Sequence, residues 1–359
     1  MPRAALTLAA VALVTLAPAL APAQMRTPSL SPHLDPSSVP GGCSSCHRGH
    51  GAPGSPMLPS PQVQLCQSCH GSRAGRDRQV ASGAVSASSS PLLLSSVLTL
   101  PFVHPMAQEG YSEHERGVVV CTSCHTPHRG LRQAVGSAAL GQRRLSTKDP
   151  TRFEYELCES CHGNRGITTQ SFSDLSRLLS PSNRSFHPVE APSRESSPSV
   201  LPSLTGREIN CTDCHGNSDP RGPAGPHGST ELYILRARYA TTDGSPESPS
   251  TFALCYSCHR REAVLSSSAF PEHRRHIVEL KASCATCHNA HGSVQNRALI
   301  RFGEETVVAG VSPSGRTGRL AFDSTGPGAG NCYLSCHGAD HAPASYGSVR
   351  PALVTPRLP

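Results

Sequence analysis

The feature that most constrains this chain is a short cysteine motif that occurs eight times. In seven copies two residues separate the cysteines and histidine follows at once, whereas the eighth copy has three intervening residues. The cysteine pairs are Cys43/Cys46, Cys66/Cys69, Cys121/Cys124, Cys158/Cys161, Cys211/Cys214, Cys255/Cys258, Cys284/Cys287 and Cys332/Cys336. The histidines that follow them are His47, His70, His125, His162, His215, His259, His288 and His337. Because histidine makes up 19 of 359 residues, eight chance successes have odds of about 10⁻¹⁰, so the histidine belongs to the motif.

This spacing matches the chemistry of covalent haem attachment. Residues i and i+3 lie on one side of a helical turn, where two thiols can add to the two vinyl groups of a haem. The next imidazole is then held near the iron. The sequence therefore predicts eight covalently bound haem c groups, with all sixteen cysteines as attachment points and the eight motif histidines as proximal iron ligands. At the last motif the extra residue would rotate the thiol of Cys332 by about 100° on a helix, so attachment through Cys336 alone is the alternative there.

Three other uses of paired cysteines explain less of the pattern. Zinc takes four nitrogen or sulfur ligands, and zinc sites made of four thiolates would leave the adjacent histidines without a role. Redox-active CxxC motifs normally occur once within a βαβ pattern, which this sequence does not show. A disulfide framework suits an exported protein but also needs no histidines.

The remaining histidines predict the second axial ligands. Nineteen histidines less the eight of the motifs leave eleven, and methionine is scarce, so ligation of each iron by two histidines is the economical assignment. The predicted distal ligands are His33, His50, His104, His128, His187, His227, His276 and His291. Three histidines are surplus: His114 and His273 are substitutes for His104 and His276, and His341 is the weakest candidate.

The histidines also define a repeat of four units. Each unit has an upstream histidine, a motif, a downstream histidine and a second motif, which predicts a quasi-linear stack of units. We expect each downstream histidine to ligate a neighbouring haem, the second in its own unit. The predicted segments are a signal peptide at 1–23, di-haem units at 24–90, 91–170, 171–265 and 266–340, and a tail at 341–359.

This architecture resembles the doubled-CxxCH family of multihaem cytochromes c, within the group that includes cytochrome c3-like proteins. The resemblance covers about residues 33–340 and rests on the paired motifs, on "CHTPH" and "CHNAHGS", and on the upstream "HP". It implies periplasmic or extracellular electron transfer through closely packed bis-histidine haems of low potential. Other cytochromes or an outer-membrane conduit would be the redox partners, and a homo-oligomer or filament is an alternative assembly. The distant His227 and the altered motif at Cys332 depart from the family pattern.

Composition predicts a fold in which cofactor replaces the apolar core. Aromatic residues are 4% of the chain and tryptophan is absent, while there are 33 prolines and 31 glycines. Haem faces supply the missing apolar surface, and each attachment constrains the loop around it. The expected fold class is a multihaem cytochrome with few secondary-structure elements: short helices at the CxxCH sites, mostly coil and little sheet. A further short helix is expected at 173–179, and segments 81–96, 180–202 and 244–250 are expected to loop out.

The N-terminus predicts export. Arg3 precedes an apolar run that ends in a small-residue cleavage site before Gln24, which is typical of a cleaved signal peptide. The run is too short and too rich in proline for a membrane span, so we expect a periplasmic or extracellular chain with no transmembrane span of its own. The net charge of +7 is scattered, which argues against a nucleic-acid partner. We expect the arginines to balance haem propionates instead.

The pattern favours an electron carrier over an enzyme. Ligation by two histidines closes both axial positions of an iron and favours low potentials. A multihaem reductase of nitrogen or sulfur oxyanions is the alternative, and it requires an iron with an open position. The altered motif that ends at His337 would be its location, and no catalytic residue is predicted elsewhere.

Overall fold

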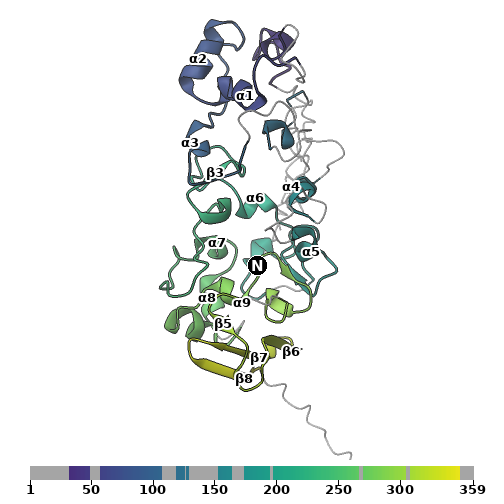
Figure 1. Ribbon diagram of the computed structural model, residues 1–359, viewed down its shortest axis with the longest axis vertical. Helices are drawn as coiled ribbons and strands as arrows, with labels where there is room; N and C mark the ends of the chain where they lie inside the picture. The colour runs from purple at the N-terminus through teal and green to yellow at the C-terminus, as the bar shows by residue number, and fades with distance from the viewer. Residues whose placement is uncertain are drawn as a thin grey trace, which may run out of the picture.

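The computed structural model shows an elongated molecule whose N-terminal helices lie at one end and whose C-terminal sheet lies at the other, with segments distant in sequence side by side between them (Figure 1). It describes residues 32–48, 57–106, 119–125, 127–128, 153–163, 174–194, 197–266, 270–304 and 308–347. The expected signal peptide, His50 and His114 lie outside these residues. The progression from α1 at one end to β8 at the other agrees with the predicted linear stack.

Helices are short and most of them surround the cysteine motifs. The α-helices are α1 (Gln62–His70), α2 (Arg73–Ala81), α3 (Ser95–Leu98), α4 (Glu154–His162), α5 (Leu175–Leu179), α6 (Cys211–Cys214), α7 (Ala253–Tyr256), α8 (Arg261–Leu265) and α9 (Cys284–Cys287). The 3₁₀ turns are η1 (Gly42–Ser45), η2 (Cys121–Ser123), η3 (Pro202–Leu204), η4 (Leu232–Ile234) and η6 (Arg297–Leu299), and η5 (Arg275–Glu279) is a π-helical turn. Within the described ranges, none of the helices is both long and apolar enough to cross a bilayer.

Strands form two minimal bridges and one larger sheet. In the bridges, β1 (Phe102–Val103) pairs with β3 (Gly228–Ser229), and β2 (Ser185–Phe186) pairs with β4 (Gly292–Ser293), both antiparallel. The larger sheet contains β5 (Val311–Ser312), β6 (Ala321–Gly326), β7 (Ala329–Cys336) and β8 (Ala339–Tyr346). Here β7 is central and pairs with the other three strands. The predicted fold class, with few elements, mostly coil and little sheet, is confirmed.

Apolar packing concentrates at the C-terminal end. Phe302, Val308, Phe322 and Leu334 form a buried cluster against this sheet. Elsewhere in the described chain, buried apolar side chains are thinly spread. A chain with so little core of its own requires other apolar material to hold it together, in agreement with a haem-filled interior.

Two local expectations are corrected. Segment 81–96 does not loop out: Arg76 donates to the carbonyl oxygens of Ala87 and Ser89, at 2.7 Å each, and holds the segment against α2. The tail expected from residue 341 does not begin there, because β8 continues to Tyr346. The helix expected at 173–179 is confirmed as α5, where the Asp174 side chain accepts a hydrogen bond from the Arg177 backbone at 3.2 Å.

Candidate haem sites

Seven of the eight cysteine motifs adopt the same helical turn. In five of them the backbone N–H of the histidine donates to the carbonyl of the first cysteine at 2.8–2.9 Å. These five motifs end at His47, His125, His215, His259 and His288. The other two, ending at His70 and His162, form the last turns of α1 and α4. The turn brings both thiols and the following imidazole to one side of the backbone, as attachment to one porphyrin requires.

Sixteen histidines are arranged as eight facing pairs. The ring-centroid separations are 5.9 Å for His47–His128, 5.9 Å for His70–His33, 5.8 Å for His125–His227, 6.2 Å for His162–His104, 6.4 Å for His215–His291, 6.4 Å for His259–His187, 6.2 Å for His288–His273 and 6.4 Å for His276–His341. An imidazole–metal bond is about 2 Å long, so two rings on opposite sides of one metal ion have centroids about 6 Å apart. Each pair therefore has the separation that a six-coordinate iron requires.

Burial keeps several imidazoles of these pairs neutral, and hydrogen bonds orient many of the rings. Burial lowers the pKa of His259, His273 and His291 to about 4, and neighbouring histidines lower it further in the same direction. Many rings also place Nδ1 on a backbone carbonyl oxygen, as His70 does with Leu92 at 3.0 Å. A neutral ring whose Nδ1–H is donated presents Nε2 as the metal ligand.

Two strained turns orient the motif histidines of the third and fourth units. Nδ1 of His215 lies 2.8 Å from the carbonyl oxygen of Tyr233, and Nδ1 of His288 lies 2.7 Å from that of Ala298. Tyr233 and Ala298 have φ values of 61° and 53°, in the left-handed region that non-glycine residues rarely adopt. The equivalent strain in both units indicates that the turns exist to aim these carbonyl groups.

The two-residue bridges position pairs of distal histidines. β1 and β2 lead directly into His104 and His187, and β3 and β4 directly follow His227 and His291. Nδ1 of His104 lies 3.0 Å from the Pro226 carbonyl oxygen, next to His227. One bridge thus fixes two histidines that face different motif histidines.

The "HGS" sequences explain how these bridges close. A Cβ atom at Gly228 would collide with the Val97 carbonyl oxygen, and one at Gly292 with the Leu178 carbonyl oxygen. The following serines are fully buried, and Ser229 donates to the Leu235 carbonyl at 2.6 Å. Glycine permits the close approach and serine ties the bridge to the turn beyond it.

Successive units join through a repeated polar contact. Gln62 on α1 accepts from the Thr122 backbone at 2.8 Å and donates to its hydroxyl at 2.9 Å. Glu154 on α4 accepts from the Thr212 backbone at 2.7 Å and from its hydroxyl at 2.9 Å. The second motif of one unit is therefore fastened to the first motif of the next, a contact that the sequence did not reveal.

The cysteines are present as free thiols. All sixteen cysteines lie in described residues and none is disulfide-bonded. Burial raises the pKa of Cys214 and Cys287 to about 12, so these two thiols are protonated in the protein without a bound group. Within the described residues, no group of three or more His, Cys, Asp or Glu side chains converges as a zinc site would require.

The predicted attachment points are similarly accessible along the chain. Cys43 and Cys124 are exposed, and the other fourteen cysteines are partly buried. The hydroxyl of the preceding serine lies 3.8 Å from Sγ of Cys69, 3.8 Å from that of Cys161 and 3.5 Å from that of Cys258. The attachment of each of the sixteen thiols to haem stays a prediction that rests on the motif itself.

Comparison with known proteins agrees with this geometry. The family model described as "Outer membrane cytochrome MtrC/MtrF-like, domains II/IV" matches residues 103–299, more than half of the chain, and the doubled CXXCH motif model matches residues 37–75. The chain belongs to the MtrC/MtrF-like cytochrome family. It is a doubled-CxxCH multihaem c-type cytochrome with covalently bound haem c, and electron transfer is its general function.

A curated relative gives the same indication over a longer span. The chain is 24% identical over 316 residues to the multiheme cytochrome MtrA of Shewanella baltica (strain OS185), covering 81% of this chain and 72% of that protein. No solved structure matches the chain. The family match ends at residue 299, before the C-terminal sheet that carries the eighth motif.

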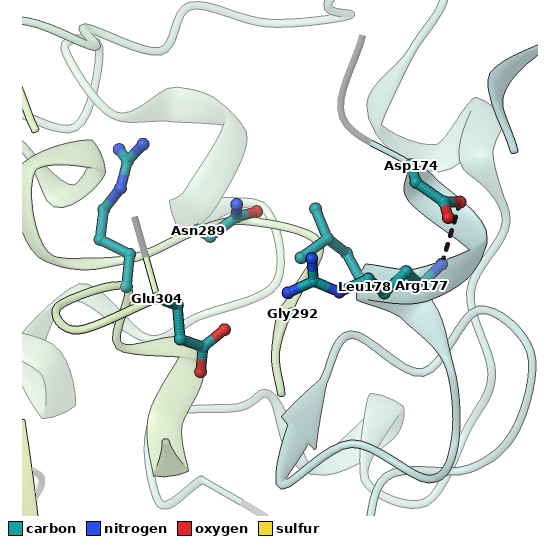
Figure 2. A pocket seen from close by; sticks show the side chains of 7 residues that line it. Asp174, Arg177, Leu178, Asn289, Gly292 and Glu304 are labelled. Carbon is teal, nitrogen blue, oxygen red and sulfur yellow. Dashed lines mark hydrogen bonds between the residues drawn. The ribbon is translucent and has the colours of Figure 1, made fainter. Parts of the chain in front are cut away.

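Two arginines of the cytochrome line a cavity next to the His215–His291 pair. A cavity of about 220 Å³ is lined by Arg177, Arg301 and Glu304, and by Asn289 and Gly292 on either side of His291. Figure 2 shows Arg177 extending from α5 toward Asn289 and Gly292. Guanidinium groups bind carboxylates in a bidentate manner, so this cavity fits the propionates of a haem next to His291.

The structure changes the expected roles of several histidines in the cytochrome. His128 and His291 do not face the second motif of their own units; they face His47 and His215, the first motif histidines of the preceding units. His273, counted as surplus, faces His288.

At the eighth motif His276 faces His341 instead of His337. Its cysteines lie on a strand, whereas the seven CxxCH motifs adopt the helical turns expected at those sites.

Proposed function

We propose that this protein is an exported octahaem cytochrome that transfers electrons along a line of eight bis-histidine haem sites. Each cysteine motif attaches one haem, and the eight facing histidine pairs are the axial ligands. Bound haem supplies the one-electron oxidation and reduction of its iron. The chain fixes the order, spacing and ligation of the sites.

The observation that carries this proposal is the contiguity of the histidine pairs. Burial is the main cause that lowers the pKa of six of these histidines. A histidine of a neighbouring pair lowers the same pKa further. Such neighbours are His33 with His128, His33 with His125, His227 with His104, His162 with His215, His291 with His187, His259 with His288, and His273 with His276. These electrostatic interactions, which act beyond direct contact, link all eight pairs in motif order.

Paired ligation supports a carrier and not a reductase. A reductase requires an iron with a vacant axial position for its substrate. Each described motif histidine from His47 to His288 faces a second imidazole, and His276 and His341 form an eighth pair. We therefore assign no catalytic residue.

The two ends of the line are the proposed ports for redox partners. The His47–His128 pair is first in motif order, and the turn before His47 contacts the chain just after α2, where the Ser45 hydroxyl donates to the Ala84 carbonyl oxygen at 3.1 Å. The His276–His341 pair is at the other end, because His341 lies on β8. Following the family, we propose other cytochromes or an outer-membrane conduit as donor and acceptor, and the periplasm or the cell exterior as the location. A filament would join the ends of successive copies.

A spectroscopic redox titration of the purified protein tests the proposal. Mass analysis of the denatured chain is expected to show eight covalent haems, and spectra to show low-spin iron in both redox states with low potentials. Absence of covalent haem would refute the proposal. A high-spin fraction in the native protein that binds cyanide or nitrite would favour the reductase.

A further inference from the structure

The eighth motif has a backbone conformation unlike the other seven. Cys332 and Cys336 lie on β7, and Cys336 pairs with Ala339 on β8. The two residues between Cys336 and Ala339, His337 and Gly338, form the hairpin turn with φ values of 46° and 79°. Positive φ at both central positions is typical of a type I′ turn. His337 thus occupies a turn instead of completing a helical motif.

The side chain of His337 is bound to a carboxylate. Its Nε2 lies 2.8 Å from Oδ2 of Asp243, and the ring is about half exposed. Oδ1 of the same carboxylate accepts from the Ser283 backbone at 2.7 Å and from the Thr286 hydroxyl at 2.6 Å. Asp243 therefore ties the β7–β8 turn to the seventh motif, through the ring nitrogen that a haem iron would need.

A different pair of imidazoles lies beside the eighth motif. The ring centroids of His276 and His341 are 6.4 Å apart with planes inclined by 33°. Nδ1 of His276 lies 2.8 Å from the Glu272 carbonyl oxygen, which leaves its Nε2 for a metal.

His341 lies on the same side of the sheet as the motif cysteines. His341 on β8 pairs with Leu334 on β7, and directly paired residues of antiparallel strands share a face. Alternation along β7 places Cys332 and Cys336 on the face of Leu334. The two cysteines, His341 and the buried Leu334 therefore border one side of the sheet.

The fourth unit pairs its histidines differently from the second and third units. In the second and third units the upstream histidines, His104 and His187, face the second motif histidine of the same unit. His276 is the upstream histidine of the fourth unit, but it faces His341. The first motif histidine of the fourth unit, His288, faces His273, which lies three residues before His276.

We propose that His276 and His341 are the axial ligands of the eighth haem, and that His337 is a positioning residue that anchors the β7–β8 turn to Asp243. This inference rests on the proposed function, because it assigns ligands within the octahaem chain. The eighth haem site then differs from the other seven, because His337, the histidine adjacent to Cys336, does not bind its iron.

The test compares His341→Ala with His337→Asn in the full-length holoprotein. Asparagine tolerates positive φ and its amide can donate to Asp243, so His337→Asn keeps the turn and removes the imidazole. The double variant carrying both changes prevents His337 from replacing a missing ligand. Haem content is measured by mass, and ferric spin state by electron paramagnetic resonance.

Wild-type protein and His337→Asn are expected to be low-spin throughout. His341→Ala in the His337→Asn background is expected to make one haem in eight high-spin, and added imidazole to restore it. A high-spin haem in His337→Asn alone would overturn the inference, and so would the absence of a high-spin haem in the double variant. In either case, eight covalent haems would still support the proposed function. Wild-type protein without covalent haem would instead refute the proposed function.

Discussion

The rings of His47 and His128 face each other nearly in parallel, 5.9 Å apart and inclined by 18°, although they belong to successive units of the repeat. His125–His227 and His215–His291 repeat this relationship in the next units. The ligand of one unit is therefore supplied by the following one. Such ligation would cross-link a chain that has little apolar core.

Removing two distal histidines together distinguishes this arrangement from ligation within a unit. His128→Ala should open the iron beside His47, whereas His104→Ala should open the iron beside His162. The double variant is expected to contain two high-spin haems, counted by electron paramagnetic resonance against total haem.

The contrary outcome is equally specific. If His128 served the second motif of its own unit, both substitutions would affect the haem at His162, and the double variant would show only one high-spin haem. Unchanged haem content in each variant confirms that the covalent attachment is intact.

The inclination of the paired rings predicts two spectroscopic classes of iron. Three pairs, those of His47, His125 and His215, have planes inclined by 18°, 10° and 2°, whereas the others are inclined by 33–53°. Near-parallel imidazole planes split the iron dxz and dyz orbitals more than tilted planes do. Ferric spectra should therefore contain a more rhombic group with smaller maximum g values.

Two variants next to the β2–β4 bridge test which iron belongs to which spectroscopic class. His291→Ala is expected to remove one signal of the rhombic group, because His291 faces His215 at 2°. His187→Ala, on the paired strand, is expected to remove a signal of the other group, because His187 faces His259 at 48°. Loss of the same kind of signal in both variants would contradict the assignment.

The sequence predicted the cofactor attachment and the linear repeat because both depend on local spacing. A CxxCH segment determines its own turn, as the bond from His47 to Cys43 shows. The repeat also carried its upstream and downstream histidines in recognisable contexts, such as "FVHPM" and "CHNAHGS".

The pairing between histidines could not be predicted, since it depends on long-range strand bridges. Val103 and Gly228 pair across two units, and neither sequence specifies the other. His341 was undervalued for a different reason: its role follows from a hairpin at His337–Gly338 that displaces the motif histidine. The sequence did contain one sign of this different pairing. The last unit has a second histidine, His273, three residues before its upstream histidine, and no other unit has one there.

The contact between Glu154 and Thr212 is expected to stabilise the junction between the second and third units. Glu154 is 5% exposed and accepts two hydrogen bonds from Thr212. Glu154→Leu leaves both donors buried without that partner, which costs about 2–4 kcal/mol in the free energy of unfolding. Glu154→Gln is the matched control and should cost less than about 1 kcal/mol, because Gln62 makes the same two contacts with Thr122. Equal losses in a denaturant titration would argue against the contact.

Glu159 predicts a pH dependence of stability. Burial, and then the charge of Glu190, raises the pKa of Glu159 to about 8. Because the folded-state pKa lies above the unfolded value, the folded protein is favoured while the group is protonated. Stability therefore falls as pH rises from about 4.5 to 8. Glu159→Gln should flatten this part of the profile of unfolding midpoint against pH, whereas Glu262→Gln, at an exposed position, should leave it unchanged.

The conformation of β7 predicts that the eighth haem has a single thioether bond. Cys332 and Cys336 are four residues apart on a strand, so their Cα atoms are separated by about 13 Å at about 3.3 Å per residue. That span exceeds the reach that one helical turn gives the other pairs. After denaturation, alkylation should label one cysteine in the C-terminal haem peptide and none in the peptide of Cys284 and Cys287. If both Cys332 and Cys336 resist alkylation, the haem is doubly attached and β7 must rearrange when it binds.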